Sequence, residues 1–505
     1  MQEEIIIIDT DAGIPPQTSD SLIEGRRNVS ALLNRFHSAQ VTIQIQAYNR
    51  LEKTRACVES VLQYTDGVDY ELLLVDNGST DGTLDYFKSV PYPKKRIIHV
   101  TKNLGAAFPG LLLSVDQLAS YTAILGNDIV VTENWLSNIL RGMEADGRIG
   151  MVCPVFSNTS NLQQVNLPFA NPEEMQRQAA AFNRPDFSKW QERLRLMTPM
   201  VVFRRECLLA IGLPVGDVGF FHDFADDDMT FRVRRAGYQA MLAGDTWVHH
   251  NHDVNHGADK DPEEFCQSLQ IGQENFREKY FGVDAWEDVN NFWMDITPHI
   301  PEPGQKGHKA VLGVDVKCGT PILDVKNRLR NFGIYDVELS AFTQSAKYVV
   351  DLNTICRGIV ACDREEFLSD QFLPEYFDYI VVDRPINRYH EPQKVINDLA
   401  RLLKPGGVLL LPLLNTFSFR EYLYCQGNHS LYNREFAYHI PPEALQAALA
   451  AFGSVRFCHP RYTRLNQKDQ DFLRTRLPQG LTEQQQGDAL TRLLTDRYIF
   501  CVKKA

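Results

Sequence analysis

VTIQIQAYN (41–49), ELLLVDNGSTDGT (71–83), RIIHVTKNLG (96–105) and YTAILGNDIVV (121–131) are the stretches that decide the fold. Each is an apolar run that ends in a polar turn, and apolar residues between the first two recur at helical spacing from Leu51 to Leu62. Strands that alternate with helices predict a mainly parallel sheet covered on both faces.

Polar side chains follow each of these predicted strands. Because the ligands of such sheets bind beyond the carboxyl ends of the strands, these positions predict a binding site at one edge. The pairs concerned are Tyr48 and Asn49, Asp76 and Asn77, Lys102 and Asn103, and Asn127 and Asp128.

The length and composition of the chain exclude several classes of protein. A chain of 505 residues exceeds what one hydrophobic core supports, so more than one domain is expected. The net charge of -12 argues against nucleic acid as a partner. The ten cysteines form no C-x-x-C pair, and no apolar run is long enough for a membrane span. We expect a cytoplasmic protein without a transmembrane segment, associated with a membrane at most peripherally.

Changes in composition and hydrophobic pattern along the chain indicate where its domains begin and end. Residues 1–40 read as an N-terminal extension, with one strand at Ile5 to Ile8 and a short helix at Val29 to Phe36. Residues 41–295 form the first α/β domain, and the Pro- and Gly-rich stretch 296–309 reads as a linker. Residues 310–505 repeat a strand–loop–helix pattern and form a second α/β domain.

The first domain resembles the family 2 inverting glycosyltransferases of the GT-A type. The resemblance runs from about Val41 to about Phe281 and rests on several motifs in order. These motifs are VTIQIQAYNRLEKTRACVESVL, LLLVDNGSTDGT, KNLG, ILGNDIVVTENWL and FADDDMTFRVRRAGYQAMLAGDTWVHH. The resemblance implies a domain that binds a nucleotide sugar.

The resemblance also implies roles for donor-binding residues. Ala47 and Tyr48 lie where the first strand meets the nucleotide base, and Asp76, with Asn77 beside it, lies where base or ribose is held. Asp76 could instead only cap a turn, and Lys102 could be a solvated charge. The diphosphate side is implied for Lys102, Asn103 and Gly105.

Asp128 matches the last Asp of the family's Asp-x-Asp metal motif, in which Gly126 replaces the first Asp and Asn127 is a helper. One carboxylate can still coordinate Mn²⁺ or Mg²⁺. His249, His250 and His252 follow the stretch AGDTWV, and His250 or His249 is the candidate to complete the metal shell.

Asp226 matches the catalytic base of the family, although Ala225 replaces the Glu that usually precedes it. Asp226, Asp227 and Asp228 could instead simply favour a helix start. The implied reaction is a single displacement, in which Asp226 takes the acceptor proton and the metal stabilises the departing nucleoside diphosphate. The expected acceptor is a glycan, a lipid-linked sugar or a protein. Trp135 and residues 157–195 are placed on the acceptor side.

The second domain resembles the class I methyltransferases that use S-adenosylmethionine. The motifs are VLGVDVKCGTP, DVELS, FDYIVVDRPINRYHEP and LARLLKPGGVLLLPLLN. The resemblance implies a Rossmann-like fold and cofactor contacts from Cys318, Gly319, Glu338 and Asp383. In the glycine-rich loop, Lys317 and Pro321 stand where Gly is usual, so the domain either methylates a substrate or only docks a partner.

Two alternatives stay open. A sugar nucleotidyltransferase shares a similar fold, but QAYNR does not resemble the Gly-rich, Arg-containing loop of that class. A non-catalytic nucleotide-binding scaffold with degenerate domains would account for Gly126, Ala225 and the weak cofactor loop.

Overall fold

A computed structural model describes the chain in two compact units. The described residues are 5–8, 39–103, 119–212, 216–217, 220, 223–252, 262–421, 437–462, 467–475, 477 and 479–505. The first unit comprises residues 1–291 and 330–332, and the second comprises residues 292–329 and 333–505. The domain bounds expected from the sequence remain a prediction.

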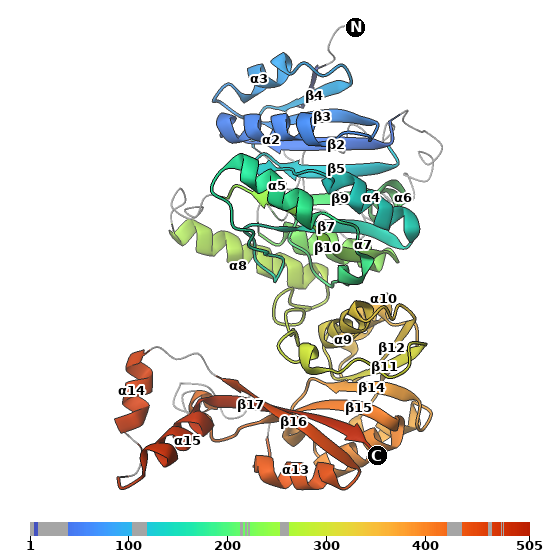
Figure 1. The fold of residues 1–505 in the computed structure, drawn as a ribbon, viewed down its shortest axis with the longest axis vertical. Helices are drawn as coiled ribbons and strands as arrows, with labels where there is room; N and C mark the ends of the chain where they lie inside the picture. The colour runs from blue at the N-terminus through green and yellow to red at the C-terminus, as the bar shows by residue number, and fades with distance from the viewer. Residues whose placement is uncertain are drawn as a thin grey trace. The chain divides into compact units, whose positions relative to one another are not determined.

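The first unit is built on one twisted sheet (Figure 1). Its strand order is β1-β4-β3-β2-β5-β9-β7-β10-β6, and β8 pairs with β10. The strands are β1 (Ile5–Ile8), β2 (Val41–Ala47), β3 (Tyr70–Asn77), β4 (Lys95–Val100), β5 (Tyr121–Gly126), β6 (Ile129–Val130), β7 (Ile149–Phe156), β8 (Gln191–Glu192), β9 (Met200–Arg204) and β10 (Gln239–His250).

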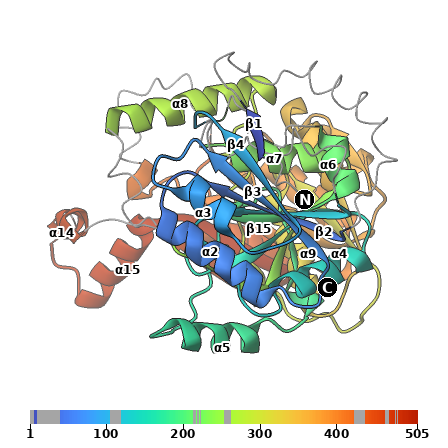
Figure 2. The same cartoon turned by 90° about the horizontal axis from the view of Figure 1, so that it is seen from above.

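The central strands are buried because their side chains are apolar on both faces. Every residue of β3 and of β7 is buried, as expected for a sheet with helices on both sides. Figure 2 shows α2 (Leu51–Tyr64), α3 (Thr83–Ser89) and α5 (Pro172–Phe182) on one side of this sheet, and α6 (Arg205–Ile211), α7 (Ala225–Arg235) and α8 (Pro262–Lys279) on the other.

Two strands depart from the pattern expected of a parallel sheet. β9 runs antiparallel to β5 and β7, and β10 runs antiparallel to β6. The edge strand β1 keeps to the pattern and pairs in parallel with β4. The sheet is therefore mixed beyond β5, because β9 returns between two strands that point the other way. The helix expected at Val29 to Phe36 lies outside the described residues.

The second unit has a seven-stranded sheet of order β13-β12-β11-β14-β15-β17-β16. If β11 is counted as the first strand of this unit, the strands from β13 to β15 have the order 3-2-1-4-5, which is that of the Rossmann type of doubly wound fold. β17 runs antiparallel to both β15 and β16, so β16 runs parallel to β15. The strands are β11 (Lys309–Val314), β12 (Val337–Thr343), β13 (Val360–Cys362), β14 (Phe377–Val382), β15 (Leu403–Leu414), β16 (Gly453–Tyr462) and β17 (Thr495–Lys504).

Helices of the second unit follow its strands in the expected alternation. They are α9 (Thr320–Asn331), α10 (Val349–Ile355), α11 (Pro392–Leu402), α13 (Pro442–Ala450), α14 (Gln467–Thr475) and α15 (Glu483–Leu494). Within the stretch 296–309, η5 (Thr297–His299) lies between the buried residues Ile296 and Ile300. None of the helices described is both long and apolar enough to span a bilayer.

Packing of α4 (Trp135–Ala145) depends on the absence of one side chain. Gly142 lies in this helix, and a Cβ built on it would come within 2.3 Å of the Trp190 ring. Trp190 is almost fully buried, and its indole N–H donates to Asp245 at 2.8 Å, so the ring cannot move aside cheaply. The glycine lets the helix lie against the indole.

We therefore predict that Gly142→Ala destabilises the protein. Alanine favours a helix over glycine by about 0.5–1 kcal/mol, but overpacking costs about 1–3 kcal/mol, so the free energy of unfolding should fall. Urea unfolding followed by tryptophan fluorescence measures this change. Gly147→Ala is the matched control because Gly147 is exposed and a Cβ added to it would have nothing within 4 Å. Equal stability of the two variants would contradict the packing.

Candidate functional site

Strand register brings the predicted donor residues to one edge of the first sheet. β2 lies between β3 and β5 and pairs in parallel with both. Ala47 pairs with Asp76, and Gln46 pairs with Gly126. The polar turns that follow the three strands consequently start at the same level.

Asp76 is fully buried at this edge. Its Oδ2 lies 2.7 Å from Nδ1 of His99, and its Oδ1 accepts the backbone N–H of Ser79 at 3.0 Å. Both interactions hold the carboxylate against the sheet, so Asp76 shapes the turn after β3. Tyr48, by contrast, is 47% exposed and remains open to a base.

Gly78 allows the chain after β4 to approach the turn after β3. Gly78 has a φ of +80°, and a Cβ built on it would lie 2.8 Å from the Asn103 nitrogen. The approach is secured by Asn77, whose side-chain N–H donates to Oδ1 of Asn103 at 2.9 Å. Lys102 is exposed beside this contact, and Gly105 lies outside the described residues.

Asn127 ties the end of β5 to the start of α2. Its amide N–H groups donate to the backbone carbonyl of Asn49 and to Thr54 Oγ1, each at 2.9 Å. The Asn127 side chain therefore holds the loop between β2 and α2 in place. Any contact with a nucleotide-sugar donor would come from its side-chain oxygen.

Asp128, His250 and His252 form a cluster that could hold a metal ion. Each offers a ligand atom, and these atoms lie within 4.8 Å of one another. Asp128 Oδ2 is 3.4 Å from His250 Nε2. The other ring nitrogen of His250, Nδ1, lies 2.7 Å from the carbonyl oxygen of Asn158, which can only accept. Nδ1 therefore carries the hydrogen, and Nε2 directs its lone pair toward the carboxylate.

Two electron-rich atoms that face each other in this way favour a cation between them or a proton on the ring. The surroundings already support negative charge on Asp128. Burial would raise the pKa of Asp128, but His250, His252 and Lys53 outweigh burial and lower it. One carboxylate oxygen and two imidazole nitrogens fit a divalent transition ion such as Mn²⁺.

The glycine that replaces the first Asp of the metal motif also has a physical role. A Cβ on Gly126 would lie 3.1 Å from Asp128 Oδ1 and 3.4 Å from the Pro199 carbonyl oxygen. The backbone at Gly126 therefore lies close to Asp128, and the other candidate ligands of the metal are His250 and His252.

Of the two histidines expected as alternatives, His250 lies in this cluster and His249 does not. Its Nδ1 lies 2.9 Å from Ser157 Oγ, and its ring is edge-on to Phe169 with centroids 5.4 Å apart. Burial is the main cause that lowers the pKa of His249. His249 and His250 are successive residues of β10 and point to opposite faces. His252 lies two residues past the end of β10, and its ring centroid is 4.9 Å from that of His250.

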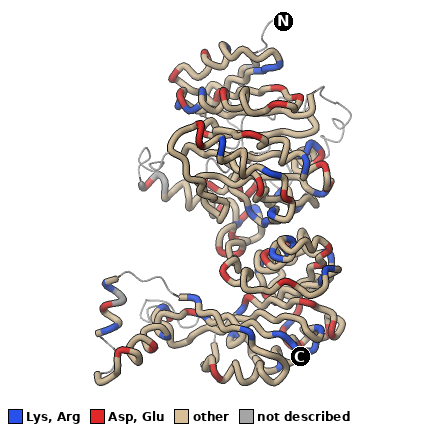
Figure 3. The backbone as a smooth tube through the Cα atoms, viewed as in Figure 1, with Lys and Arg blue, Asp and Glu red and all other residues tan. Residues whose placement is uncertain are grey.

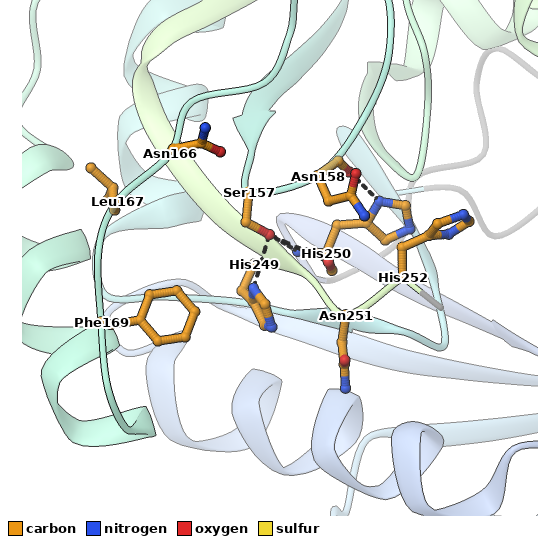
Figure 4. Close-up of a pocket in the computed structure, with 9 residues that line it drawn as sticks. All are labelled: Ser157, Asn158, Asn166, Leu167, Phe169, His249, His250, Asn251 and His252. Atoms are coloured by element: carbon orange, nitrogen blue, oxygen red, sulfur yellow. Dashed lines mark hydrogen bonds between the residues drawn. The ribbon is translucent and has the colours of Figure 1, made fainter. Parts of the chain in front are cut away.

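A pocket of about 290 Å³ adjoins the histidines (Figure 4). It is lined by hydroxyl, amide, imidazole and aromatic groups from the ends of β7 and β10 and from the segment between β7 and α5. The lining residues are Ser157, Asn158, Asn166, Leu167, Phe169, His249, His250, Asn251 and His252. Trp135, expected on the acceptor side, is instead fully buried and donates its indole N–H to Thr65.

Asp226 lies in the first turn of α7 and is partly exposed. The Thr198 hydroxyl donates to its Oδ1. The next residue, Pro199, accepts the N–H of Gly126 at 2.9 Å. One two-residue segment therefore links the α7 carboxylate to the end of β5, where Asp128 follows.

The two following aspartates are buried in ion pairs. Asp227 pairs with Arg195, yet burial raises the pKa of Asp227 to about 6, with the neighbouring Asp226 adding to the rise. Asp228 lies 2.9 Å from Arg232 and 2.7 Å from Lys279. These cations lower the pKa of Asp228 although burial opposes them. Of the three, Asp226 is the one accessible to a ligand.

In the second unit, Cys318 and Gly319 lie in the turn after β11. Cys318 is buried, and Gly319 has a φ of +109° with its backbone close to Ile355. Asp383 follows β14, and its Oδ1 accepts the indole N–H of Trp293 at 3.0 Å. These residues lie at the carboxyl edge of the sheet, as the resemblance implies.

Glu338 lies at the opposite edge, which corrects its predicted role. It is the second residue of β12 and pairs with Ala310 near the start of β11. The Tyr376 hydroxyl donates to its carboxylate at 3.0 Å. The residue that follows the carboxyl end of β12 is Gln344, whose N–H groups donate to Asp315. A ribose diol at this end would meet the hydrogen-bonded pair of Gln344 and Asp315 in place of Glu338.

We predict that the three adjacent aspartates differ sharply in their effect on stability. Asp228→Asn leaves buried Arg232 and Lys279 poorly compensated and should cost about 3–5 kcal/mol of unfolding free energy. Asp226→Asn keeps an oxygen for the Thr198 hydroxyl and should cost about 1 kcal/mol or less. Chemical denaturation of both variants compares them directly, and similar losses would contradict the assigned environments.

Residues 42–210 match the sequence model described as Glycosyl transferase family 2. No curated protein sequence matches the chain significantly. Among solved structures, the mannosyltransferase PcManGT from Pyrobaculum calidifontis, in complex with GDP-Man and Mn²⁺, is 17% identical with a TM-score of 0.32, over 51% of this chain and 76% of that chain. A SAM dependent methyltransferase from Archaeoglobus fulgidus is 15% identical with a TM-score of 0.30, over 46% of this chain and 99% of that chain.

Proposed function

We propose that the first unit, in which residues 42–210 match the sequence model described as Glycosyl transferase family 2, transfers a sugar from a nucleotide-sugar donor to an acceptor hydroxyl with inversion. The observation that carries the proposal is the cluster of Asp128, His250 and His252, linked to Asp226 through Thr198 and Pro199. A metal site and an accessible carboxylate adjoin the same strand edge.

The donor would lie across the carboxyl ends of β2, β3 and β5. Tyr48 offers an exposed ring for the base, and Asp76 and Asn77 define the polar wall beside it. Lys102 and Asn103 would face the diphosphate, since Gly78 brings their backbone close to the β3 turn. Electrostatic attraction from Lys102 suits a negatively charged diphosphate.

Asp128, His250 and His252 would hold the metal. Bound there, a divalent cation supplies charge stabilisation for the departing nucleoside diphosphate. Of the expected ions, Mn²⁺ fits better than Mg²⁺, because Mg²⁺ prefers oxygen ligands and two of these three ligand atoms are nitrogens. The Asn158 carbonyl fixes the tautomer of His250 that such binding requires.

Asp226 would accept the proton of the acceptor hydroxyl. Thr198 orients the carboxylate by donating its hydroxyl to Oδ1, and the side chain stays partly exposed. Asp227 and Asp228 are held in buried ion pairs and support the start of α7 without contact with substrate.

The acceptor would enter the pocket beside the histidines. Phe169 is 37% exposed and offers an apolar ring, while Ser157, Asn158 and Asn166 offer hydrogen-bonding groups. That combination suits a sugar, which presents a C–H face and hydroxyls. The acceptor sugar could belong to a glycan, a lipid-linked saccharide or a glycosylated protein.

We expect the second unit to dock or bind a ligand without methyl transfer. The observation that favours this role is Gln344 at the carboxyl end of β12, whose backbone N–H and side-chain amide both donate to Asp315. Methylation of a glycan remains the competing hypothesis for this unit, and binding of S-adenosylmethionine by the purified chain would support it.

We predict metal-dependent release of nucleotide from one member of a panel of UDP-, GDP-, dTDP- and CMP-sugars. In Asp226→Asn this release should fall by about 10²–10⁴-fold, the usual contribution of a general base. Free nucleotide measured over time, with and without Mn²⁺ and an acceptor mixture, tests the prediction. If the full panel is inactive but the donors bind by calorimetry, the non-catalytic scaffold becomes the better reading.

We also predict that substitutions of His252 and His249 have different effects on metal binding and on acceptor use. His252→Ala should weaken Mn²⁺ binding by about 10- to 100-fold, whereas His249→Ala should leave it unchanged and impair acceptor use. Mn²⁺ binding is measured by calorimetry on the free protein, and acceptor KM by the release assay. Equal losses of Mn²⁺ affinity in both variants would overturn the ligand set.

A further inference from the structure

The carboxyl edge of the second unit's sheet gathers arginines from several elements. β14, β15 and β16 end at this edge and β17 begins there, since β17 is antiparallel to its neighbours. The positions adjoining it include Arg388 in η8 (Ile386–Arg388), Arg420 after β15, Arg461 near the end of β16 and Arg497 near the start of β17. Figure 3 marks the basic residues along these strands.

Strand register places two of these arginines opposite each other. Arg461 pairs with Arg497 in the β16–β17 ladder, and Arg497 pairs on its other side with Leu414. Like charges directly opposite on neighbouring strands destabilise a sheet. Both residues are half-buried, so water screens their repulsion only in part.

The electrostatic balance around Arg497 is unfavourable. Burial is the main cause that lowers the pKa of Arg497. Asp383 opposes that effect, but Arg388, Arg461 and Arg420 reinforce it. A guanidinium in this position is destabilised in the protein alone, and an added negative charge would relieve it.

Contacts within the unit hold the surrounding groups in place. Arg461 donates to both oxygens of Asp295, at 2.7 and 3.0 Å, and its guanidinium lies over the Trp293 ring. Trp293 in turn donates to Asp383. Arg420 reaches Asp496 at 3.4 Å. The carboxylates thus fix the geometry of the edge, while Asp383 is the main attractive influence on Arg497.

We propose that Arg388, Arg461 and Arg497 form a binding site for a phosphate-bearing ligand at the carboxyl edge of the second sheet. Guanidinium groups match phosphate oxygens through paired N–H donors, and a phosphate carries more than one negative charge. Ligands of doubly wound sheets bind at this edge. A sulfonium cofactor would bring another positive charge to the same place, so the arginines favour an anion. The proposal does not depend on glycosyl transfer by the first unit.

The test is calorimetric titration of the full chain with inorganic pyrophosphate in the presence of EDTA, which removes metal-dependent binding in the first unit. Arg497→Gln should weaken this binding by about 10- to 100-fold, the effect of removing a charged hydrogen-bond donor. Arg364→Gln is the control, because Arg364 is an exposed arginine of the same unit paired with Glu366. Asp128→Asn should also leave metal-free binding intact.

Thermal unfolding supplies a second measurement. Without ligand, Arg497→Gln should unfold at the same temperature as the natural chain or higher, because it removes a repelled charge. Pyrophosphate should stabilise the natural chain but not the variant. Co-sedimentation with phosphatidylcholine vesicles, with and without phosphatidic acid, distinguishes a lipid headgroup from a soluble phosphate.

Binding of pyrophosphate or of phosphatidic acid vesicles that depends on Arg497 supports the proposal, and the better ligand identifies the source of the phosphate. Equal binding by the natural chain and Arg497→Gln, or binding of neither probe by the natural chain, overturns it. A lower unfolding temperature of the ligand-free variant would make Arg497 a structural partner of Asp383, which also contradicts it.

Discussion

Parallel pairing of β2 with β3 and β5 is the constraint on which the first unit depends. Because Ala47 pairs with Asp76 and Gln46 pairs with Gly126, three polar turns begin at one level of the sheet. A shift of register by one residue would turn each strand's buried side chains to the other face. The buried strand residues thus fix the position of the polar ones, and the site follows from the core.

The same edge shows how burial gives different properties to adjacent residues of one type. Asp227 and Asp228 are enclosed with Arg195, Arg232 and Lys279, and their charges serve to anchor α7. Asp226 begins the same helix but reaches toward Thr198 and remains partly exposed. The buried ion pairs would hold the proposed base Asp226 in position, because moving the helix would unpair charges in a region of low dielectric.

The second unit places a different chemistry at the equivalent edge of a related sheet. Its strand order is Rossmann-like, yet the carboxyl end of β12 carries Gln344, and arginines adjoin the ends of the later strands. A fold fixes where a ligand lies, whereas the side chains at that edge decide which ligand it is. Arg461 and Arg497 lie opposite each other on β16 and β17, and a juxtaposition of like charges is the kind of local conflict that functional sites retain.

The sequence by itself determined the α/β class of both units, the four strands that begin the first domain, and the positions of Asp76, Asn77 and Asp128 after their strands. These follow from apolar runs and turn residues, which are local properties of the chain. Tertiary structure alone decided which histidines meet Asp128, because Asp128, Asn158 and the histidines come from three segments that are distant in the sequence. It also decided the edge at which Glu338 lies: β12 continues through apolar residues to Thr343, and its register against β11 places Glu338 at the amino end. Hydrogen-bond register joins residues far apart in sequence, so a local pattern cannot specify it.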